Sequence, residues 1–495
     1  MNRLASSKCA RRVFLALAAL ASICLAVACG SSGFKSLGGG FSKSSLKGQY
    51  VISQTGVGVN QQNTCCNAFS ETIIFTADGS GKLTATCDDF DQVGGPFGGC
   101  SAGVAGTYTI ASDGTGSINI GGSNGVNFAI TMIDDSHFYI IEQDVFETAS
   151  GFGEKQDTTA FTAAPSGSFV FKAHEIDTSS RVGGITITAG AIAGTEDFLS
   201  LGSLSSNMAV ATSAAMTAPD ANGRGTFTLT DGSSFHYYVV NSSKFYIMSS
   251  ASGSLEIGQA EVQVAPAGGF SVATLPGSYV FGSSGDTSAT GLAGIHSAGV
   301  FTTDGGGNIT AGAVDYVQDA TVNSNLSVSG GTYTLAASGR GTINLTLAGG
   351  TISPQIFWTL NGTRAYFLAD STLAVEDGTF SLQQGAPFTA LTSQAAFVMD
   401  GFDVAFKDRV GLFKPTSGGF NWNQAANSFD AVQGIGLLTA TATNGTAQVS
   451  SNGRVTVTVN NVDNSIVFYL SSANTGFMVQ EDADIGGAFT QQASQ

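Results

Sequence analysis

Residues 331–345, Gly-Thr-Tyr-Thr-Leu-Ala-Ala-Ser-Gly-Arg-Gly-Thr-Ile-Asn-Leu, constrain the fold most, because versions of this segment recur three more times along the chain. In each version, β-forming residues stand on either side of a glycine-bearing stretch, a pattern typical of two strands joined by a tight turn. The segment therefore predicts a recurrent β-hairpin. The other versions are residues 106–118, 220–229 and 451–459, and the last two keep only its second half.

The hairpin belongs to a longer repeat whose opening and closing segments also recur. Each repeat opens on an aromatic residue followed by Val, and each closes with an aromatic strand and a later Gln. The opening aromatic residues lie 119, 110 and 118 positions apart, so the repeat has the length of a domain. The openings are Tyr50, Phe169, Tyr279 and Phe397, and the closing glutamines are Gln156, Gln263, Gln383 and Gln491.

The third repeat contains eight short runs of β-forming residues. Turn segments such as 304–308 and 337–341 separate them, and loops this short predict antiparallel neighbours. Eight strands in a meander lose both exposed edges when the first pairs with the last, which predicts an up-and-down barrel. A β-sandwich is the alternative. The runs are residues 278–281, 299–303, 308–316, 331–335, 341–347, 353–360, 364–369 and 378–382.

This layout resembles the calycin barrels, which include the lipocalins and avidins, and it implies that a barrel lumen could carry a small apolar ligand. The whole chain resembles a group of uncharacterised repeat-containing bacterial lipoproteins with G-x-[YF]-x-F, F-x-x-D-G-x-G-x-[IL] and G-R-G-T motifs. The resemblance covers residues 46–492 and implies a fold but no known activity. Matching segments are residues 75–83, 301–309 and 339–342.

Residues 1–29 have the pattern of a bacterial export signal. Basic residues precede the uncharged segment 13–28, whose 16 residues are short for a membrane-spanning helix. Residues 25–29, Leu-Ala-Val-Ala-Cys, resemble the lipobox, which implies that Cys29 becomes acylated (the palmitate-bearing lipoprotein anchor) and forms the new N-terminus. Ordinary cleavage near Ala28 is the alternative. An Asp directly after the acylated Cys would resemble an inner-membrane retention signal. This chain has Gly30 there, which favours the outer membrane as the location of the anchor.

These features divide the chain into six parts. The signal peptide is followed by the acylated Cys and a Gly/Ser-rich tether, which we expect to be flexible and to lack a core of its own. Four β repeats then complete the chain. The boundaries are 1–28 for the signal peptide, 29–45 for the tether, and 46–160, 161–270, 271–388 and 389–495 for the repeats.

The chain is strongly acidic, with a formal net charge of −17. Loss of the four basic residues of the signal peptide brings the mature chain to about −21. A field of this sign repels nucleic-acid phosphates, so we expect no nucleic-acid partner. The 66 Gly and 34 Phe beside only 11% charged residues favour short strands, many turns and aromatic interiors over helices.

Four cysteines of the expected mature chain, besides Cys29, lie in the first repeat. An even number in an exported protein predicts disulfides. Because adjacent cysteines rarely bond each other, we expect Cys65 and Cys66 each to pair with Cys87 or Cys100, in an order that the sequence leaves open. Zinc is the alternative, but no C-x-x-C pair is present and no His follows until His137.

Other motifs are better explained by turns than by chemistry. Ser123 has the G-x-S-x-G spacing of a nucleophile elbow, but it falls between two strand-like segments instead of before a helix. The Asp-Gly-x-Gly turns at Asp78 and Asp304 lack the further acidic ligands of a calcium loop. Two acidic clusters are interpreted as solvated loops, so no metal and no cofactor are predicted. These clusters are Asp88, Asp89 and Asp91, and Glu481, Asp482 and Asp484.

The two tryptophans are candidates for ligand recognition. Trp358 stands at an alternate strand position and is expected in a core. Trp422, flanked by Asn421 and Asn423, is a candidate ligand-binding residue as well as a candidate core residue.

The expected function is that of a non-enzymatic, membrane-anchored envelope lipoprotein, a spacer, adhesin or binding module. Tandem copies without a shared catalytic set favour this function, since repetition raises reach and avidity. Its partners would be the membrane, through the lipid anchor, and an envelope polymer, a surface protein or a small apolar ligand. A carrier of an apolar ligand is the first alternative, although 34 Phe indicate filled lumens. A hydrolase is the remote alternative.

Overall fold

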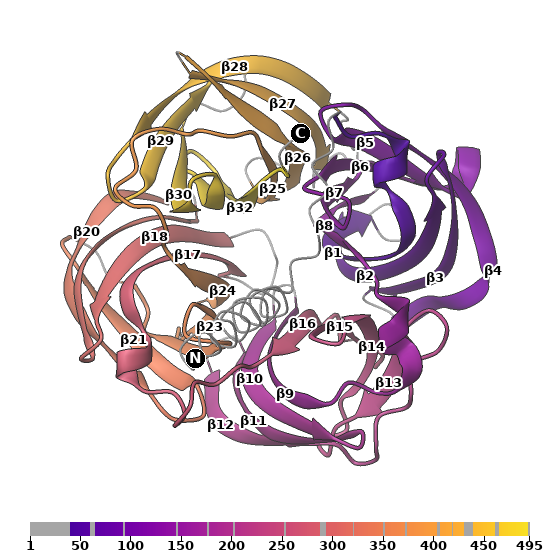
Figure 1. Cartoon of the computed structure of the whole chain (residues 1–495), viewed down its shortest axis with the longest axis horizontal. Helices are drawn as coiled ribbons and strands as arrows, with labels where there is room; N and C mark the ends of the chain where they lie inside the picture. The colour runs from indigo at the N-terminus through magenta and orange to yellow at the C-terminus, as the bar shows by residue number, and fades with distance from the viewer. Residues whose placement is uncertain are drawn as a thin grey trace, which may run out of the picture. The chain divides into compact units, whose positions relative to one another are not determined.

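The computed structural model contains four successive repeats of eight antiparallel strands, which confirms the predicted all-β fold. Residues Phe41–Gln492 form one compact unit, and Figure 1 shows the strands of each repeat gathered around their own centre. No helix of the described residues is long and apolar enough to cross a membrane. The structure describes residues 40–493 apart from 60–64, 93–94, 145–146, 176–177, 201–202, 252–253, 288–293, 320, 350–351, 372–373, 403–405, 418, 430–438 and 461–464.

The first repeat is a closed barrel in which each strand pairs with its neighbours in the chain. The first strand also pairs with the last, with Tyr50 opposite both Phe75 and Lys155, so this repeat is a barrel and not a sandwich. Its strands are β1 (Lys47–Val59), β2 (Cys65–Asp78), β3 (Lys82–Gln92), β4 (Gly95–Ile110), β5 (Thr115–Ile120), β6 (Val126–Met132), β7 (His137–Glu142) and β8 (Glu147–Lys155).

The second repeat has the same eight strands but closes less regularly than the other three. Its strand order is that of the other repeats, but β12 and β13 remain the two edges of the sheet. An irregular segment with Pro219 lies between them, and only the isolated bridge Thr212–Leu229 and single bonds such as Ser213 N to Thr228 O (2.9 Å) join the two edges. The strands are β9 (Gly167–Glu175), β10 (Ser179–Thr188), β11 (Ala191–Ser200), β12 (Ser203–Ala211), β13 (Arg224–Thr228), β14 (Ser234–Asn241), β15 (Lys244–Ser249) and β16 (Ile257–Val262).

The third repeat is a closed barrel, and each of the eight predicted runs lies on or overlaps one of its strands. Several strands are longer than the runs, because polar residues extend them beyond the apolar positions. The strands are β17 (Pro276–Asp286), β18 (Gly294–Asp304), β19 (Asn308–Gln318), β20 (Thr321–Leu335), β21 (Arg340–Leu347), β22 (Gln355–Thr359), β23 (Arg364–Ala369) and β24 (Val375–Leu382).

The fourth repeat is also a closed barrel. Its strands are β25 (Ala395–Phe402), β26 (Phe406–Thr416), β27 (Gly419–Phe429), β28 (Thr439–Val449), β29 (Arg454–Val459), β30 (Ile466–Ser472), β31 (Thr475–Gln480) and β32 (Asp484–Gln491). Four short 3₁₀ helices complete the described elements: η1 (Lys43–Ser45), η2 (Gly122–Asn124), η3 (Thr158–Thr162) and η4 (Val272–Thr274).

The recurrent hairpin is confirmed as the connection between the fourth and fifth strands of a repeat. In the third repeat Gly331 pairs with Leu345 and Leu335 with Gly341. The turn closes through Ala336 N to Arg340 O at 2.8 Å, and Gly339 takes a φ of +94°, which favours glycine. The β4–β5 turn of the first repeat has the same bonds.

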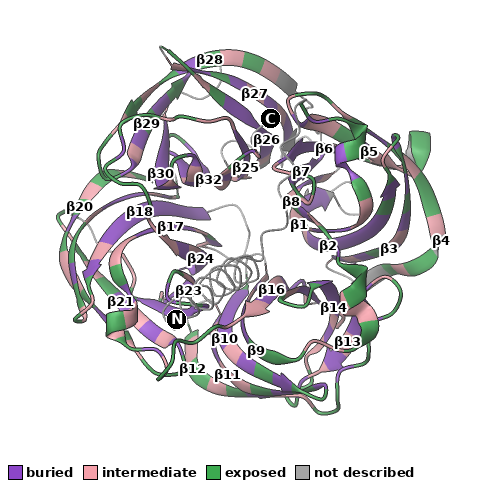
Figure 2. Cartoon of the chain, viewed as in Figure 1, coloured by how far each residue is buried: buried purple, intermediate pink, exposed green. Residues whose placement is uncertain are grey.

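The lumens of the four repeats are filled by side chains. Strands alternate buried and exposed residues, as Figure 2 shows, and the opening aromatic residues are almost fully buried. In the second repeat the lumen contains a cavity of only about 30 Å³, room for about one water molecule. The largest side chains of the lumen clusters are Tyr50, Phe75 and Phe128, Phe169 and Tyr237, Tyr279 and Phe380, and Phe397 and Trp422.

The end of the expected tether is part of the folded unit. Phe41 is buried in the core of the first repeat, and its backbone N–H donates to Ser112 O at 3.1 Å. The helix η1 follows directly. The expectation that residues 29–45 lack a core is therefore wrong for the segment from Phe41 onward. The aromatic ring of Phe41 packs into the apolar core of the first repeat.

Candidate functional site

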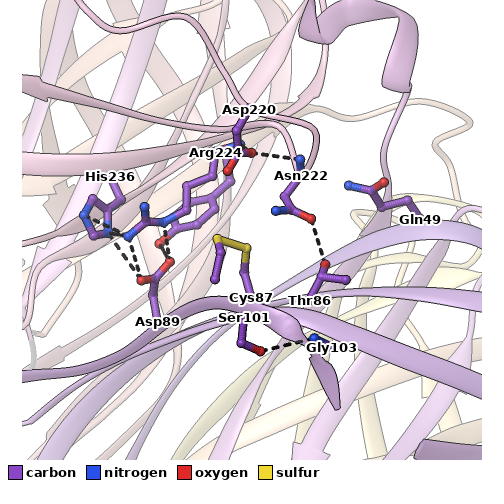
Figure 3. Close-up of a disulfide and its surroundings, with 12 residues drawn as sticks. Gln49, Thr86, Cys87, Asp89, Ser101, Gly103, Asp220, Asn222, Arg224 and His236 are labelled. Carbon is purple, nitrogen blue, oxygen red and sulfur yellow. Dashed lines mark hydrogen bonds and ion pairs between the residues drawn. A yellow bond between two sulfur atoms is a disulfide. The ribbon is translucent and has the colours of Figure 1, made fainter. Parts of the chain in front are cut away.

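Consecutive repeats are joined by a bidentate ion pair that sequence analysis missed. Arg224, which begins β13 directly after the turn of the second repeat, donates from Nε to Asp89 Oδ2 (2.7 Å) and from Nη2 to Asp89 Oδ1 (2.9 Å). Figure 3 shows these side chains pointing toward one another between the two repeats, with His236 beside them. The same geometry recurs between Arg340 and Asp197 and between Arg454 and Asp315.

An aromatic donor completes each of these three clusters. It stands opposite the Arg on the sixth strand of the same repeat. Burial alone would raise the pKa of Asp89, but hydrogen bonds from His236, Arg224 and Tyr238 outweigh it and lower this pKa to about 2. Asp89 is therefore buried as a charged group that accepts hydrogen bonds from its neighbours. The aromatic donors are Tyr238 to Asp89, Trp358 to Asp197 and Tyr469 to Asp315.

A glutamine after the last strand of each repeat forms a second link to the next repeat. Its side-chain amide donates to two backbone carbonyls there, one in the hairpin turn and one on the sixth strand. In the fourth repeat this residue is Gln492, and not the predicted Gln491, which is exposed. The acceptors are Asn222 and Val239 for Gln156, Ser338 and Thr359 for Gln263, Asn452 and Leu470 for Gln383, and Asp113 and Met132 for Gln492.

The contacts between repeats close on themselves. Apolar clusters join the first repeat to the second, the second to the third, the third to the fourth and the fourth to the first. We call these contacts junctions 1–2, 2–3, 3–4 and 4–1. The cluster at junction 4–1 includes Tyr139, Ile141, Val398 and Val410.

Junction 4–1 has no counterpart of this Arg–Asp pair among the described residues. Asn427 occupies the position that Asp89 has in the first repeat. Both lie on the third strand of their repeat, in the line of cross-strand neighbours that starts on the first strand three residues after the opening aromatic. Thr115 stands at the position of Arg224, and its cross-strand partner Thr131 replaces the aromatic donor. Asn427 Nδ2 instead donates to the backbone carbonyls of Glu142 (3.1 Å), Asp144 (3.2 Å) and Glu147 (2.9 Å).

All four repeats line a cavity of about 440 Å³, which we call the central cavity. Its wall includes many Ser and Thr residues, for example Ser53, Ser150 and Thr379. Phe152, whose side chain is 43% exposed, also lines it, although a ring of this size is usually buried. This volume lies in the range of small-molecule sites.

A charged cluster on the cavity wall joins the second and third repeats. Asp377 Oδ1 accepts from Lys172 Nζ (2.8 Å), while Oδ2 lies 3.0 Å from His174 Nδ1 and accepts from Ser180 Oγ (2.7 Å). Burial would raise the pKa of Asp377, but Lys172 and His174 outweigh it and lower this pKa. Ser180 and Asp377 both face the same nitrogen of His174, so the cluster is not the relay of a serine hydrolase, which uses both nitrogens.

His296 is the least satisfied polar residue of the cavity wall. Its Nδ1 is buried without a hydrogen-bond partner among the described residues, and burial lowers its pKa to about 4. The ring therefore stays neutral at ordinary pH.

The disulfide of the first repeat differs from the expected pairing. Cys87 bonds Cys100, because β3 and β4 place the two residues directly opposite each other. Neither residue is therefore bonded to one of the adjacent cysteines. The side chains of Cys65 and Cys66 lie outside the described residues, as does Cys29.

The tryptophans do not face a ligand. Trp422 is 1% exposed, stacks on Phe397 at 4.2 Å between ring centroids and donates to Gln424, so the expectation of a ligand-binding residue is not supported. Trp358 is buried as expected, but at junction 2–3 instead of in a lumen. The alternation of apolar and polar residues along a strand could not distinguish burial in a lumen from burial between two repeats.

The remaining candidates are explained by local structure. Ser123 lies in η2, in the connection between β5 and β6, and is exposed. Asp78 and Asp304 accept from backbone N–H groups of their own turns, for example Ser80 N at 2.7 Å and Gly306 N at 2.6 Å. Among the described residues no group of three or more potential metal ligands occurs. The acidic cluster at Asp89 was wrongly interpreted as a solvated loop, since it lies on β3, where Asp88 is exposed but Asp89 and Asp91 are buried.

Comparison with known proteins adds little to this geometry. No protein-family model and no curated protein sequence matches the chain. Among solved structures, the chain is similar to a mutant of transferrin-binding protein B from Haemophilus parasuis, at 8% identity over 67% of this chain and 74% of that chain, with a TM-score of 0.19. It is also similar to CghA, at 8% identity over 90% and 89% of the two chains, with a TM-score of 0.14. Scores this low carry no argument about function.

Proposed function

We propose that this protein is an exported, non-enzymatic, lipid-anchored protein of the cell envelope that binds a ligand in the central cavity. The observation that carries the proposal is the contrast between the filled lumens and a cavity of about 440 Å³ to which all four repeats contribute. A binding site at the meeting point of several domains is a common arrangement.

The lining indicates the chemistry of the ligand. The exposed ring of Phe152 offers an apolar contact, and the hydroxyl groups of Ser53, Ser150 and Thr379 offer hydrogen bonds. A molecule with one apolar face and several polar groups suits such a wall, and fragments of an envelope polymer have this character. A carrier of an apolar ligand inside a lumen is disfavoured by the packed lumen clusters.

The membrane anchor in this proposal rests on the lipobox-like residues 25–29. Acyl chains contribute about 0.8 kcal/mol per buried methylene, so a multiply acylated Cys29 would hold the folded unit on a membrane, which we expect to be the outer membrane. Labelling with an alkyne fatty acid should mark the parent chain and not Cys29→Ser. Labelling of both chains would contradict the anchor.

Native mass spectrometry of the full chain from detergent micelles tests the binding site. Soluble peptidoglycan fragments and phospholipids serve as the two probes. We expect a bound fragment with the parent, loss of this mass in Phe152→Ala, and retention in Val322→Ala, an exposed apolar residue that does not line the cavity. Binding of phospholipid alone would favour the apolar carrier, and binding of neither probe would favour a spacer or adhesin.

A further inference from the structure

Junction 4–1 is the weakest junction by its chemistry. The other three junctions each contain a bidentate Arg–Asp pair, whereas the equivalent positions here hold the neutral residues Thr115, Thr131 and Asn427. Hydrogen bonds between neutral groups are roughly half as strong as charge-assisted ones. The apolar cluster of this junction contains two alanines, Ala129 and Ala396, as does the cluster of junction 3–4, whereas the clusters of junctions 1–2 and 2–3 contain none.

The same replacements leave space. A cavity of about 550 Å³ lies at junction 4–1, lined by Thr115, Ala129 and Thr131 of the first repeat and by Val410 and Gln424 of the fourth. At the equivalent positions the other junctions hold an Arg and a Tyr or Trp side chain. This pocket is open to solvent, so the two repeats make no packing contacts where it lies.

Junction 4–1 also differs in its connectivity. Each of the other junctions joins two repeats that follow one another in the chain, so a short linker keeps them close after any separation. The fourth and first repeats are not consecutive, and no linker limits how far they can separate. Opening therefore gains the most conformational freedom at this junction.

Contacts connect this junction to the central cavity. Tyr139 belongs to the junction cluster, and its hydroxyl group shares a hydrogen bond of 2.8 Å with the hydroxyl group of Thr490 in the fourth repeat. Its ring packs against Phe152 of the cavity wall with 5.2 Å between ring centroids. Thr490 lines the cavity as well, so separation of Tyr139 from Thr490 would open the cavity wall.

We propose that junction 4–1 is the gate of the central cavity: the repeats stay docked at the other three junctions and separate at this one to admit the ligand. This inference rests on the proposed function, since a gate serves a cavity that binds a ligand. The opening itself is a property of the free protein and can be measured without any ligand.

Hydroxyl-radical footprinting of the full chain tests the gate, because each junction contains a buried tyrosine. Tyr139 is 2% exposed at junction 4–1, and the matched controls Tyr238, Tyr366 and Tyr469 of the other junctions are each 0% exposed. If no junction opened, all four would react slowly, because none is more than 2% exposed. With a gate, Tyr139 is oxidised about ten-fold faster, since reactivity follows the population of the open form. Equal rates at all four tyrosines would overturn the proposal.

Two variants assign the opening to the three replaced positions. The triple variant Thr115→Arg, Thr131→Tyr and Asn427→Asp recreates the cluster of the other junctions and should lower the oxidation of Tyr139 to the level of the controls. The converse variant Asp89→Asn, Arg224→Thr and Tyr238→Thr should raise the oxidation of Tyr246, which is buried at junction 1–2. The converse variant keeps the test decisive if the first does not fold, and an unchanged Tyr246 would contradict the assignment.

The footprint separates this inference from the proposed function. A protein that binds neither probe but oxidises Tyr139 rapidly has an opening junction without the proposed ligand. A protein that binds peptidoglycan fragments but protects Tyr139 as well as the controls has the cavity site without this gate.

Discussion

Arg224 of the second repeat and Asp89 of the first form two parallel hydrogen bonds, of 2.7 and 2.9 Å, across the boundary between two barrels. The Arg directly follows the glycine of the turn that recurs in the sequence. Equivalent pairs form at Arg340 and Arg454. The recurrence of this turn is therefore explained by docking between repeats as well as by strand connection.

Arg224→Ala should destabilise the protein by about 2–5 kcal/mol, the usual cost of leaving one partner of a buried ion pair unpaired. Asp89, whose carboxylate is buried, would then keep only Tyr238 and His236 as partners at junction 1–2. Chemical denaturation of the full chain measures the loss.

Arg224→Lys is the matched control for charge. Lys keeps the positive charge but cannot form two parallel bonds, so we expect an intermediate loss. A Lys variant as stable as the parent would show that charge alone, and not bidentate geometry, holds the junction.

Acid should weaken the same junction. The pKa of Asp89 is lowered to about 2, against about 3.9 for an unfolded Asp, so the unfolded chain binds more protons between these values. The stabilisation by Asp89 is therefore complete above about pH 4 and is lost as the pH falls toward 2. Urea titrations at several pH values should show this loss in the parent and a smaller one in Asp89→Asn.

Asp408 should make the stability of the protein depend on pH in the opposite direction. Burial, and then the charge of Asp400, raise the pKa of Asp408 to about 8, despite a hydrogen bond from Thr148 of the first repeat. The folded protein thus keeps a proton that the unfolded chain releases near pH 4, and stability falls as the pH rises from about 4 to 8. Asp408→Asn should flatten this part of the profile and stabilise the protein at pH 8. A profile that is unchanged in this variant would contradict the raised pKa.

The closing glutamines should each contribute through two hydrogen bonds to the next repeat. Gln383→Ala and Gln492→Ala should each cost about 1–3 kcal/mol, since the backbone carbonyl of a buried residue, Leu470 or Met132, loses its side-chain donor. The neighbouring Gln491 is exposed, so Gln491→Ala serves as a matched control and should leave the midpoint of thermal unfolding unchanged.

Peptide mapping without reduction should recover a peptide that links Cys87 to Cys100. Removal of this bond by Cys87→Ser and Cys100→Ser should cost about 2–4 kcal/mol, the usual contribution of a disulfide. Recovery of Cys87 bonded to Cys65 or Cys66 would contradict the observed pairing.

The sequence predicted the elements of this fold better than their assembly. Strand runs, the turn at Gly339 and the pairing of first and last strands all follow from local alternation, turn residues and the cost of an exposed edge. The second repeat closes less regularly, since only an isolated bridge and single backbone bonds join β12 and β13 around the irregular segment with Pro219.

The sites were harder to predict, because they form between repeats. Asp89 looked like one member of a solvated acidic cluster, and nothing near it in the sequence indicates Arg224 as its partner. One signal was present: Arg recurs after the turn glycine in three repeats and is replaced by Thr115 in the first. Since a hairpin turn does not require Arg, its recurrence indicated a contact outside the hairpin.

The central claim is that four barrels behave as one unit held by their junctions, and scanning calorimetry of the full chain tests it most directly. We expect one cooperative transition, and in Arg340→Ala, which breaks junction 2–3, a shift of the whole transition to lower temperature. The claim would be contradicted if the parent showed several independent transitions and Arg340→Ala shifted only those of the second and third repeats.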